Sequence, residues 1–328
     1  MKALIVVTPT DYNRLVFAHT RQAHYIPADE IIFVGSNELN ELIKAEKDGL
    51  LQTSPSDPLS DGFIQKVSFI NEDDILPFAD VHACIAKHMA PLLAGRELPR
   101  GITGWYYQQF LKMQFARITP DETYMVWDGD TVPCGEFSMH SDIGVPYLDV
   151  KQEYHQEYFD TIRTIFPGTE KVIGPSFISE HMLIFSNIMR DLMDTIEINN
   201  NLEGPTFWEK IIHAIPPEKI QNSSFSEFET YGTYVAFRHP TTYKLREWHS
   251  FRLAAEFFDP MTICERDYIW LRKSFEAISF EKNQYVREDH KNLFDNPEYQ
   301  EKLSARKMLE VAQEAFSDGY MESWDILG

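Results

Sequence analysis

The sequence predicts an α/β fold in which a mostly parallel central sheet is flanked by helices. Short apolar runs rich in strand-forming residues recur along the first half of the chain, at residues 3–7, 30–35, 66–70 and 124–127. Between them lie segments with the apolar spacing of a helix, at residues 37–47 and 104–117. Strands that alternate with helices are typical of βαβ units. Such sheets bind ligands beyond the carboxyl ends of their strands, so residues just after each run are candidates for a site.

The first such candidates follow the run at 3–7. This run ends in Thr8-Pro9-Thr10-Asp11, and we expect a helix to begin here with Thr10 or Asp11 as its N-cap. Thr8 and Thr10 would then lie on the ligand side of the sheet. The chain has no Gly-x-Gly-x-x-Gly after this run and no Gly-x-x-x-x-Gly-Lys-Ser/Thr, which argues against a dinucleotide-binding dehydrogenase and a P-loop enzyme.

Composition and charge indicate a folded protein and exclude two classes of partner. Of the 328 residues, 43% are hydrophobic and 25% are charged, as in ordinary globular proteins. The formal net charge of −21 argues against a nucleic-acid surface and against polybasic attachment to lipid, because both need clustered Lys and Arg. The first apolar run is too short for a signal peptide and no stretch approaches a membrane span, so we expect a cytoplasmic protein.

The cysteines indicate neither a disulfide framework nor a zinc site. Cys84, Cys134 and Cys264 are odd in number, widely spaced and form no Cys-x-x-Cys pair. We therefore expect reduced thiols.

The run at 124–127 ends on two carboxylates one glycine apart, Asp128-Gly129-Asp130. Alternate residues of an extended chain point the same way, so both carboxylates could bind one hard divalent cation. The cation could in turn bridge to a diphosphate. Gly129 would let backbone or ligand approach closely. The alternative is a plain Asp-Gly turn, which is common at strand ends.

The predicted helix just before this run carries a second unusual pattern. Trp105, Gln108, Gln109 and Lys112 are spaced at i, i+3, i+4 and i+7 and therefore share one side of the helix. If that side faces the site, Lys112 could bind a phosphate. The alternative is a solvated face of an amphipathic helix, which the periodicity by itself favours.

The middle of the chain is expected to contain an insertion at 141–170, rich in Tyr, Asp and Glu, with a helix at about 150–165. A strand at 171–175 and a helix at 187–198 should follow. His181 lies between them and is either a core histidine, the commoner role, or a sugar contact.

Two Ser/Thr-x-x-Glu patterns read as helix starts. Thr206 and Glu209 fit a capping box, and Ser226 with Glu229 has the same spacing, so by spacing alone Glu229 is a capping residue.

His249 follows the basic and aromatic residues 244–248, a cluster capable of binding metal or phosphate. The tail from residue 267 is polar and helical in pattern, and we expect it to pack as accessory helices.

Taken together, these motifs resemble the GT-A-type, Asp-x-Asp-containing nucleotide-sugar glycosyltransferases. The chain is particularly similar to a poorly characterised bacterial group in which three motifs occur in one order. They are the Gly-Trp…Gln-Gln…Lys helix from Gly104 to Lys112, the Asp-x-Asp strand ending in Trp127 to Thr131, and the Ser-Glu-aromatic-Glu segment 226–232, here followed by Trp248-His249. The resemblance covers residues 1 to about 255.

The resemblance implies a Rossmann-like GT-A domain at 1–255 and a helical extension at 256–328 packed on it. It implies Mn²⁺ or Mg²⁺ on Asp128 and Asp130, with His249 matched by its order in the chain as a further ligand. The residues expected to bind the nucleotide and donor sugar are Thr8, Thr10, Trp105, Gln109, Lys112, Asp128 and His181.

The implied reaction moves a sugar from a nucleoside-diphosphate sugar, expected to be a UDP-sugar, to a hydroxyl of a glycan or glycolipid acceptor. The cation and Lys112 would stabilise the charge on the departing diphosphate. Inverting transfer, which we favour over retaining transfer, needs a carboxylate base, for which Glu229 is the first candidate and Glu227 the second. The oligomeric state is left open, and an oligomer is compatible with the sequence.

Two alternative functions stay open at this point. A nucleotidyltransferase also uses an α/β sheet and acidic metal ligands, but usually carries a Gly-rich basic loop after the first strand, which residues 8–11 do not form. A noncatalytic carbohydrate-binding protein is the third possibility, and a metal titration with nucleoside diphosphates would separate it from both enzymes.

Overall fold

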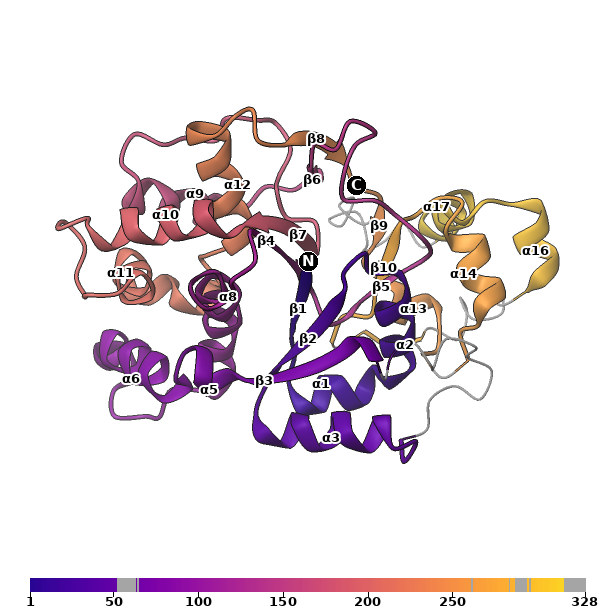
Figure 1. Ribbon diagram of the computed structural model, residues 1–328, viewed down its shortest axis with the longest axis horizontal. Coiled ribbons are helices and arrows are strands. Elements are labelled where there is room, and N and C mark those ends of the chain that lie inside the picture. The colour runs from indigo at the N-terminus through magenta and orange to yellow at the C-terminus, as the bar shows by residue number, and fades with distance from the viewer. Residues whose placement is uncertain are drawn as a thin grey trace.

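The centre of the fold is a mostly parallel five-stranded sheet of order β3-β2-β1-β4-β7 (Figure 1). The computed structural model describes residues 1–51, 63, 65–260, 262–282, 284–286, 294 and 296–315, and all that follows concerns these residues. The strands are β1 (Lys2–Val6), β2 (Glu30–Gly35), β3 (Val67–Asn71), β4 (Thr123–Trp127) and β7 (His181–Phe185). Strands β1 to β4 run parallel to one another, and β7 runs antiparallel to β4.

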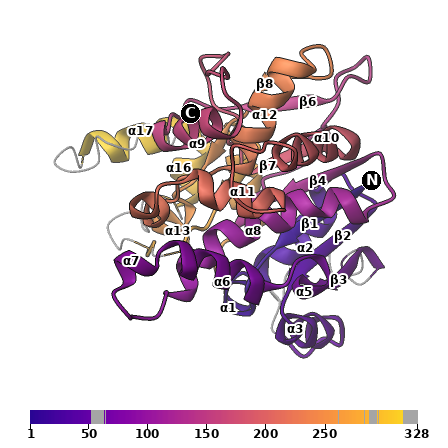
Figure 2. The ribbon, with the colours of Figure 1, turned by 90° about the vertical axis from the view of Figure 1, so that its left-hand side faces the viewer.

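Helices cover both faces of this sheet (Figures 1 and 2). One face carries α1 (Pro9–Arg14), α2 (Val16–Tyr25) and α3 (Asn37–Lys47). The other carries α5 (Glu72–Ile75), α6 (Phe78–His88), α8 (Arg100–Ile118), α10 (Ser186–Glu197), α11 (Phe207–Ala214) and α12 (Glu227–Arg238), with α7 (Ala90–Leu93) and α9 (Gln156–Ile165) near the ends of the layer. Successive strand residues alternate between the two cores, as Leu4 and Ile5 do, because side chains of a strand point to opposite faces.

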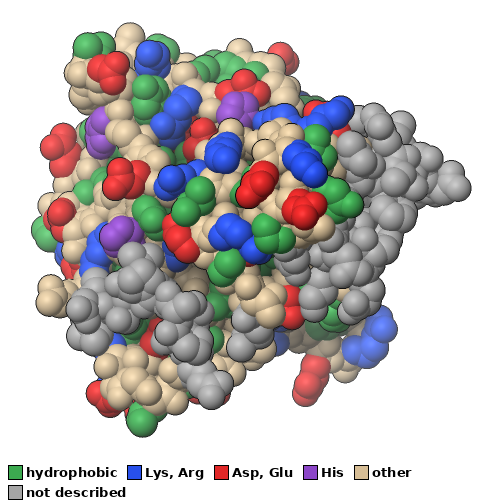
Figure 3. Space-filling model, turned by 90° about the vertical axis from the view of Figure 1, so that its right-hand side faces the viewer, with side chains coloured by type: hydrophobic (Ala, Val, Ile, Leu, Met, Phe, Trp, Pro, Cys, Tyr) green, Lys and Arg blue, Asp and Glu red, His purple; other side chains and the backbone are tan. Residues whose placement is uncertain are grey.

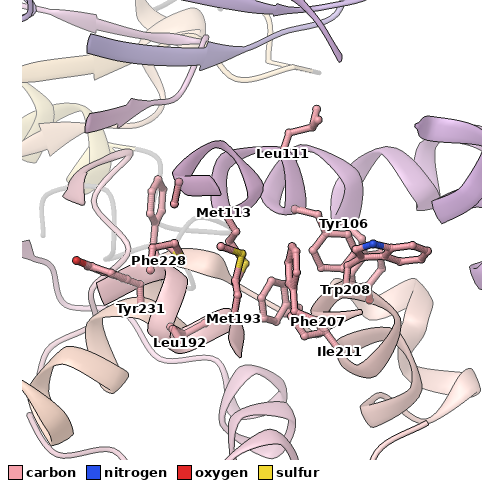
Figure 4. Packing of buried hydrophobic residues seen from close by; sticks show 14 of the residues in the cluster. Tyr106, Leu111, Met113, Leu192, Met193, Phe207, Trp208, Ile211, Phe228 and Tyr231 are labelled. Atoms are coloured by element: carbon pink, nitrogen blue, oxygen red, sulfur yellow. The ribbon is translucent and has the colours of Figure 1, made fainter. Parts of the chain in front are cut away.

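Helix α8 is buried between the sheet and three other helices. Figure 4 shows Leu111 and Met113 on opposite sides of α8, with Met113 facing Met193 of α10. The same cluster includes Phe207, Trp208 and Ile211 of α11 and Phe228 and Tyr231 of α12. Close packing of large apolar side chains tolerates little displacement. The position of α8 relative to the start of α12 is therefore fixed by the core.

Two small sheets extend the fold beyond the end of β4. β5 (Thr131–Pro133) pairs antiparallel with β10 (Ala277–Ser279), which pairs parallel with β9 (Ser250–Phe251). β6 (Tyr147–Val150) pairs with β8 (Lys244–Glu247). The segment expected to be helical from residue 256 onward thus also supplies a strand, and its apolar side chains form a separate cluster with Leu15 and Val132. Its helices are α13 (Ala254–Phe257), which crosses its start, α14 (Glu265–Leu271), α16 (Pro297–Lys302) and α17 (Ala305–Ala315).

The predicted strands at 3–7, 30–35, 66–70 and 124–127 and the predicted helices at 37–47, 104–117 and 187–198 are confirmed to within a few residues. The strand predicted at 171–175 is wrong: its apolar run is interrupted by Gly174 and Pro175, and β7 lies instead at 181–185. The helix predicted from 150 begins only at Gln156, since Tyr147–Val150 is a strand.

The helix after β1 begins earlier than predicted. Thr8, rather than Thr10 or Asp11, is the N-cap of α1, because its Oγ1 accepts a hydrogen bond of 3.1 Å from the backbone N–H of Asp11. Pro9 follows as the first helical residue, where its missing N–H costs nothing.

On the face that Figure 3 presents, Lys and Arg side chains are mixed with Asp and Glu and form no broad field of one sign. Among the helices that the structure describes, none has the length and apolar character needed to cross a bilayer.

Candidate functional site

Thr8 and the Asp128-Gly129-Asp130 loop lie at the point where the strand order of the sheet changes direction. Strands β2 and β3 lie on one side of β1 in the sheet, and the later strand β4 lies on its other side. Ligands bind at such a switch point in open α/β sheets, beyond the carboxyl ends of the strands. Thr8 follows β1, and Asp128 follows β4. A Cβ on Gly129 would lie 3.4 Å from side-chain atoms of Ile5 and Val7, so glycine lets the two loops approach closely.

The Asp128-Gly129-Asp130 loop is held by backbone hydrogen bonds from both sides. The N–H of Asp128 donates to the carbonyl of Glu180 over 2.8 Å, just before β7. The carbonyl of Asp130 accepts a 2.8 Å hydrogen bond from the N–H of Phe280, just after β10. The two carboxylates therefore stand on a rigid support where the large sheet meets the small one.

Lys112 joins Asp128 to Glu227. Its Nζ donates to Asp128 Oδ1 and to Glu227 Oε1, each over 2.7 Å. The side chains of Lys112 and Glu227 are 5% exposed, whereas that of Asp128 is 32% exposed, so Asp128 is the member that reaches solvent. Burial opposes the charge on Lys112, but both carboxylates favour it and the pKa of Lys112 is raised overall.

The alternative of a solvated helix face is wrong for this part of α8. Gln109 is buried, and its Oε1 accepts a 3.0 Å hydrogen bond from the N–H of Glu227. Gln109 thus positions the start of α12. Trp105, one turn earlier, is 37% exposed. Burial raises the pKa of the Glu227 carboxyl, against the lowering effect of Lys112.

Asp130 is a half-buried carboxyl whose negative charge is disfavoured. Burial raises its pKa to about 7, and the charges of Asp128 and Glu281 add to this, against Arg252 and Arg14. A divalent cation would relieve the repulsion between Asp128 and Asp130, and carboxylate oxygens suit Mn²⁺ or Mg²⁺.

The two carboxylates fit a cation that is also bound by a substrate. Among the described residues, no group of three His, Cys, Asp or Glu side chains is arranged to hold a metal ion. Mg²⁺ commonly uses one or two carboxylates together with substrate phosphates and water. His249 is tied to Glu276 through hydrogen bonds of its backbone N–H (3.0 Å) and carbonyl (2.8 Å), while its buried Nδ1 has no partner within the described chain.

Glu180 is a strained residue that sequence reasoning missed. Its φ of 61° places a non-glycine residue in the left-handed region, which costs energy and recurs at functional sites. Its carboxylate accepts hydrogen bonds from Lys151 (2.8 Å) and Ser250 (2.9 Å). These contacts hold the carbonyl that receives the Asp128 N–H. The apolar run Met182 to Phe185, flanked by polar residues, was the signal that could have revealed β7; no sequence signal indicates the strain.

Glu229 lies apart from the Lys112 cluster. Its side chain is buried, and its Oε2 accepts from Ser176 Oγ over 2.6 Å and from the N–H of Phe177 over 3.1 Å. Ser226 does cap α12, accepting from the N–H of Glu229 over 3.2 Å. The Glu229 side chain does not complete a capping box, whereas Thr206 and Glu209 form the predicted one.

His181 occupies a buried polar network beneath the site. Its Nδ1 lies 2.8 Å from the Ser179 carbonyl and its Nε2 lies 2.8 Å from Asp149 Oδ2. The imidazole ring is thus held at both of its nitrogens. Arg246 binds the same carboxylate through two hydrogen bonds of 2.6 Å. Thr8 and Thr10, in contrast, are exposed at the carboxyl end of β1.

Comparison with known proteins gives one family and several distant structures. A model described as a family of unknown function (DUF6492) matches residues 61–296. The curated proteins include no match. Mouse xyloside xylosyltransferase 1 in its apo form is similar at a TM-score of 0.41 and 14% identity, over 88% of this chain and 100% of that chain.

Two other structures are similar to a comparable degree. The galactosyltransferase LgtC in complex with donor and acceptor sugar analogs gives a TM-score of 0.40 and 12% identity, over 96% of each chain. The glycosyltransferase GlyE of Streptococcus pneumoniae TIGR4 gives 0.37 and 9%, over 96% of this chain and 63% of that chain.

Proposed function

The chain belongs to the DUF6492 family, whose function is unknown, and we propose that it is a metal-dependent glycosyltransferase using a nucleoside-diphosphate sugar. The observation that carries the proposal is the position of Asp128 and Asp130. They follow β4 at the switch point of the sheet, next to the buried cation of Lys112.

The donor side of the site is assigned to the loop after β4 and to α8. Asp128 and Asp130 would hold Mn²⁺ or Mg²⁺, which when bound supplies positive charge for the departing diphosphate. Lys112 adds a fixed positive charge and is already oriented by its two carboxylates, so little reorganisation is needed on binding. Thr8 and Thr10 are assigned to the nucleotide, and we propose a UDP-sugar as the donor.

Glu227 is the residue that we assign as the base. It binds the same Lys112 ammonium as Asp128, whereas Glu229 makes no ion pair with that ammonium and accepts hydrogen bonds from Ser176 and Phe177 with its Oε2. In the proposed inverting step the acceptor oxygen bonds to the anomeric carbon of the donor as its bond to the diphosphate oxygen breaks. The bonding electron pair leaves with the diphosphate, and the acceptor proton passes to Glu227.

The test begins with donor binding and slow hydrolysis. The purified protein is titrated with UDP and other nucleoside diphosphates, with Mn²⁺ and with EDTA, and is then incubated with a panel of nucleotide sugars. We expect Mn²⁺-dependent binding and release of free sugar from one donor. Asp128→Asn and Asp130→Asn should each abolish the Mn²⁺ dependence, while Asp142→Asn, a change of an exposed carboxylate in a loop, should leave it intact.

Three results would contradict the proposal. Binding of the diphosphate with the same metal dependence in Asp130→Asn would remove the assigned site. Release of pyrophosphate from a nucleoside triphosphate and a sugar phosphate would indicate a nucleotidyltransferase. Binding of simple sugars without any turnover of a nucleotide sugar would indicate a noncatalytic carbohydrate-binding protein.

A further inference from the structure

A second group of polar side chains lies beside the Asp128 loop and is not used by the proposed donor site. At its centre is Arg252, whose guanidinium lies 2.8 Å from Glu281 and 3.6 Å from Glu153. It also lies 3.9 Å from Glu180, whose carbonyl receives the Asp128 N–H. The group is therefore connected to the loop that carries Asp128 and Asp130.

Tyr158 of α9 is the member of this group that has no partner. The residue is only 9% exposed, and no hydrogen bond joins its hydroxyl to a residue that the structure describes. The hydroxyl oxygen itself is open to solvent rather than sealed in the core. Burial, followed by the charges of Glu153 and Glu227, raises the pKa of the phenol, so the hydroxyl stays protonated and can donate. A solvent-accessible hydroxyl with no protein partner can donate a hydrogen bond to a bound ligand.

The face of α9 that carries Tyr158 is held against the start of α12. One turn after Tyr158, the hydroxyl of Thr161 donates to the carbonyl of Ser224 over 2.6 Å. Ser224 lies three residues before Glu227, the proposed base. Tyr158 therefore belongs to the part of α9 that packs near the start of α12, where the charges of Glu153, Glu227 and Arg252 act on its phenol.

The chemistry of this group favours an uncharged, hydroxyl-rich ligand. Tyr158 and Arg252 can donate hydrogen bonds, and the carboxylates of Glu153 and Glu227 can accept them from hydroxyl groups. Three carboxylates around one guanidinium would repel an anionic ligand.

We propose that Tyr158, Arg252 and Glu153 form the acceptor subsite and that its ligand is a neutral sugar, whose hydroxyl is presented to Glu227. This inference rests on the proposed glycosyltransferase function. It adds the class of acceptor and the residues that select it. Tyr158 orients the acceptor and takes no part in donor binding.

The experiment uses the full chain with Mn²⁺ and the nucleotide sugar that it hydrolyses fastest. Methyl glucosides, galactosides and mannosides serve as neutral acceptors, and the corresponding hexose 6-phosphates as anionic ones. Transfer and hydrolysis are measured separately for the parent, Tyr158→Phe, Arg252→Lys and Tyr154→Phe. Tyr154 is a matched control because it is an exposed tyrosine four residues earlier, bonded to Gln156.

We expect Tyr158→Phe to raise the acceptor KM by about 3- to 10-fold, as for one lost hydrogen bond, with donor hydrolysis and UDP affinity unchanged. Arg252→Lys should also shift the ratio of transfer to hydrolysis toward hydrolysis. Tyr154→Phe should behave as the parent does. Melting temperatures check that each variant folds.

Several outcomes would overturn the inference. An unchanged acceptor KM in Tyr158→Phe would do so, as would a preference of the parent protein for the hexose phosphates as acceptors. So would a parent protein that hydrolyses the donor but neither transfers the sugar to a neutral acceptor nor binds one detectably. A parent protein that neither binds UDP with Mn²⁺ nor hydrolyses a nucleotide sugar would instead contradict the proposed function. The two failures are therefore distinguishable.

Discussion

The ammonium of Lys112 lies 2.7 Å from Asp128 Oδ1, which joins the middle of α8 to the first residue after β4. The same ammonium holds Glu227 at the start of α12. Three segments far apart in the sequence therefore meet at one buried positive charge. Changes to this charge should affect stability and ligand binding together.

Lys112→Met should destabilise the fold by about 3–5 kcal/mol, because it leaves the Glu227 carboxylate buried without its partner. It should also weaken binding of a nucleoside diphosphate by about 1.5–3 kcal/mol. Urea unfolding and titration calorimetry measure the two effects. The double variant Lys112→Met/Glu227→Gln should recover much of the stability but none of the affinity. Equal urea midpoints for Lys112→Met and the parent would show that the pair is not buried as described.

Asp130→Asn should stabilise the protein when metal is removed. Burial and the charge of Asp128 raise the pKa of Asp130 to about 7, so at pH 8 its ionised form opposes folding. Removing that charge should raise the free energy of unfolding by on the order of 2 kcal/mol. The measurement is urea unfolding at pH 8 in EDTA, with Asp142→Asn as the control. A less stable Asp130→Asn protein would mean that the carboxylate is compensated by neighbouring positive charges.

Glu229→Gln should leave donor hydrolysis near the parent rate and change the dependence of stability on pH. Burial raises the pKa of Glu229 above its usual value, so the parent loses stability as the pH rises above about 4.5, and the neutral amide does not. Melting temperatures from pH 5 to 8 should therefore favour the variant increasingly. A fall in transfer of roughly 10²-fold or more, with donor binding intact, would instead return Glu229 to the role of base.

Asp149→Asn should destabilise the fold by about 3–5 kcal/mol at neutral pH, since His181 and Arg246 would lose the carboxylate between them. Burial raises the pKa of Asp149, but hydrogen bonds from His181 and Arg246 outweigh this effect and hold the pKa below its usual value. The stability that Asp149 contributes is thus present above about pH 4 and lost as the pH falls through the lower folded pKa. Urea midpoints from pH 7 to 3 should converge for parent and variant, and a constant difference would contradict this account.

The sequence by itself determined the strands of the parallel sheet and the residues at their ends. The runs at 3–7, 30–35, 66–70 and 124–127 could be predicted because strands buried on both faces are continuously apolar. Asp128 and Asp130 could be assigned to the ligand edge because chain order alone places them after such a run. Ser226 and Thr206 could be predicted as caps, since capping depends on residues three apart.

Only the tertiary structure decided which side chains meet across segments. The periodicity of α8 suggested a solvated face, yet Lys112 is buried because Asp128 and Glu227, 16 and 115 residues away, neutralise it there. Spacing could not show which of Glu227 and Glu229, two positions apart on one helix, lies at the site. Their roles depend on their partners from other segments, which are Lys112 for Glu227 and Ser176 for Glu229. The strain at Glu180 and the free hydroxyl of Tyr158 are likewise set by long-range packing, which local patterns do not encode.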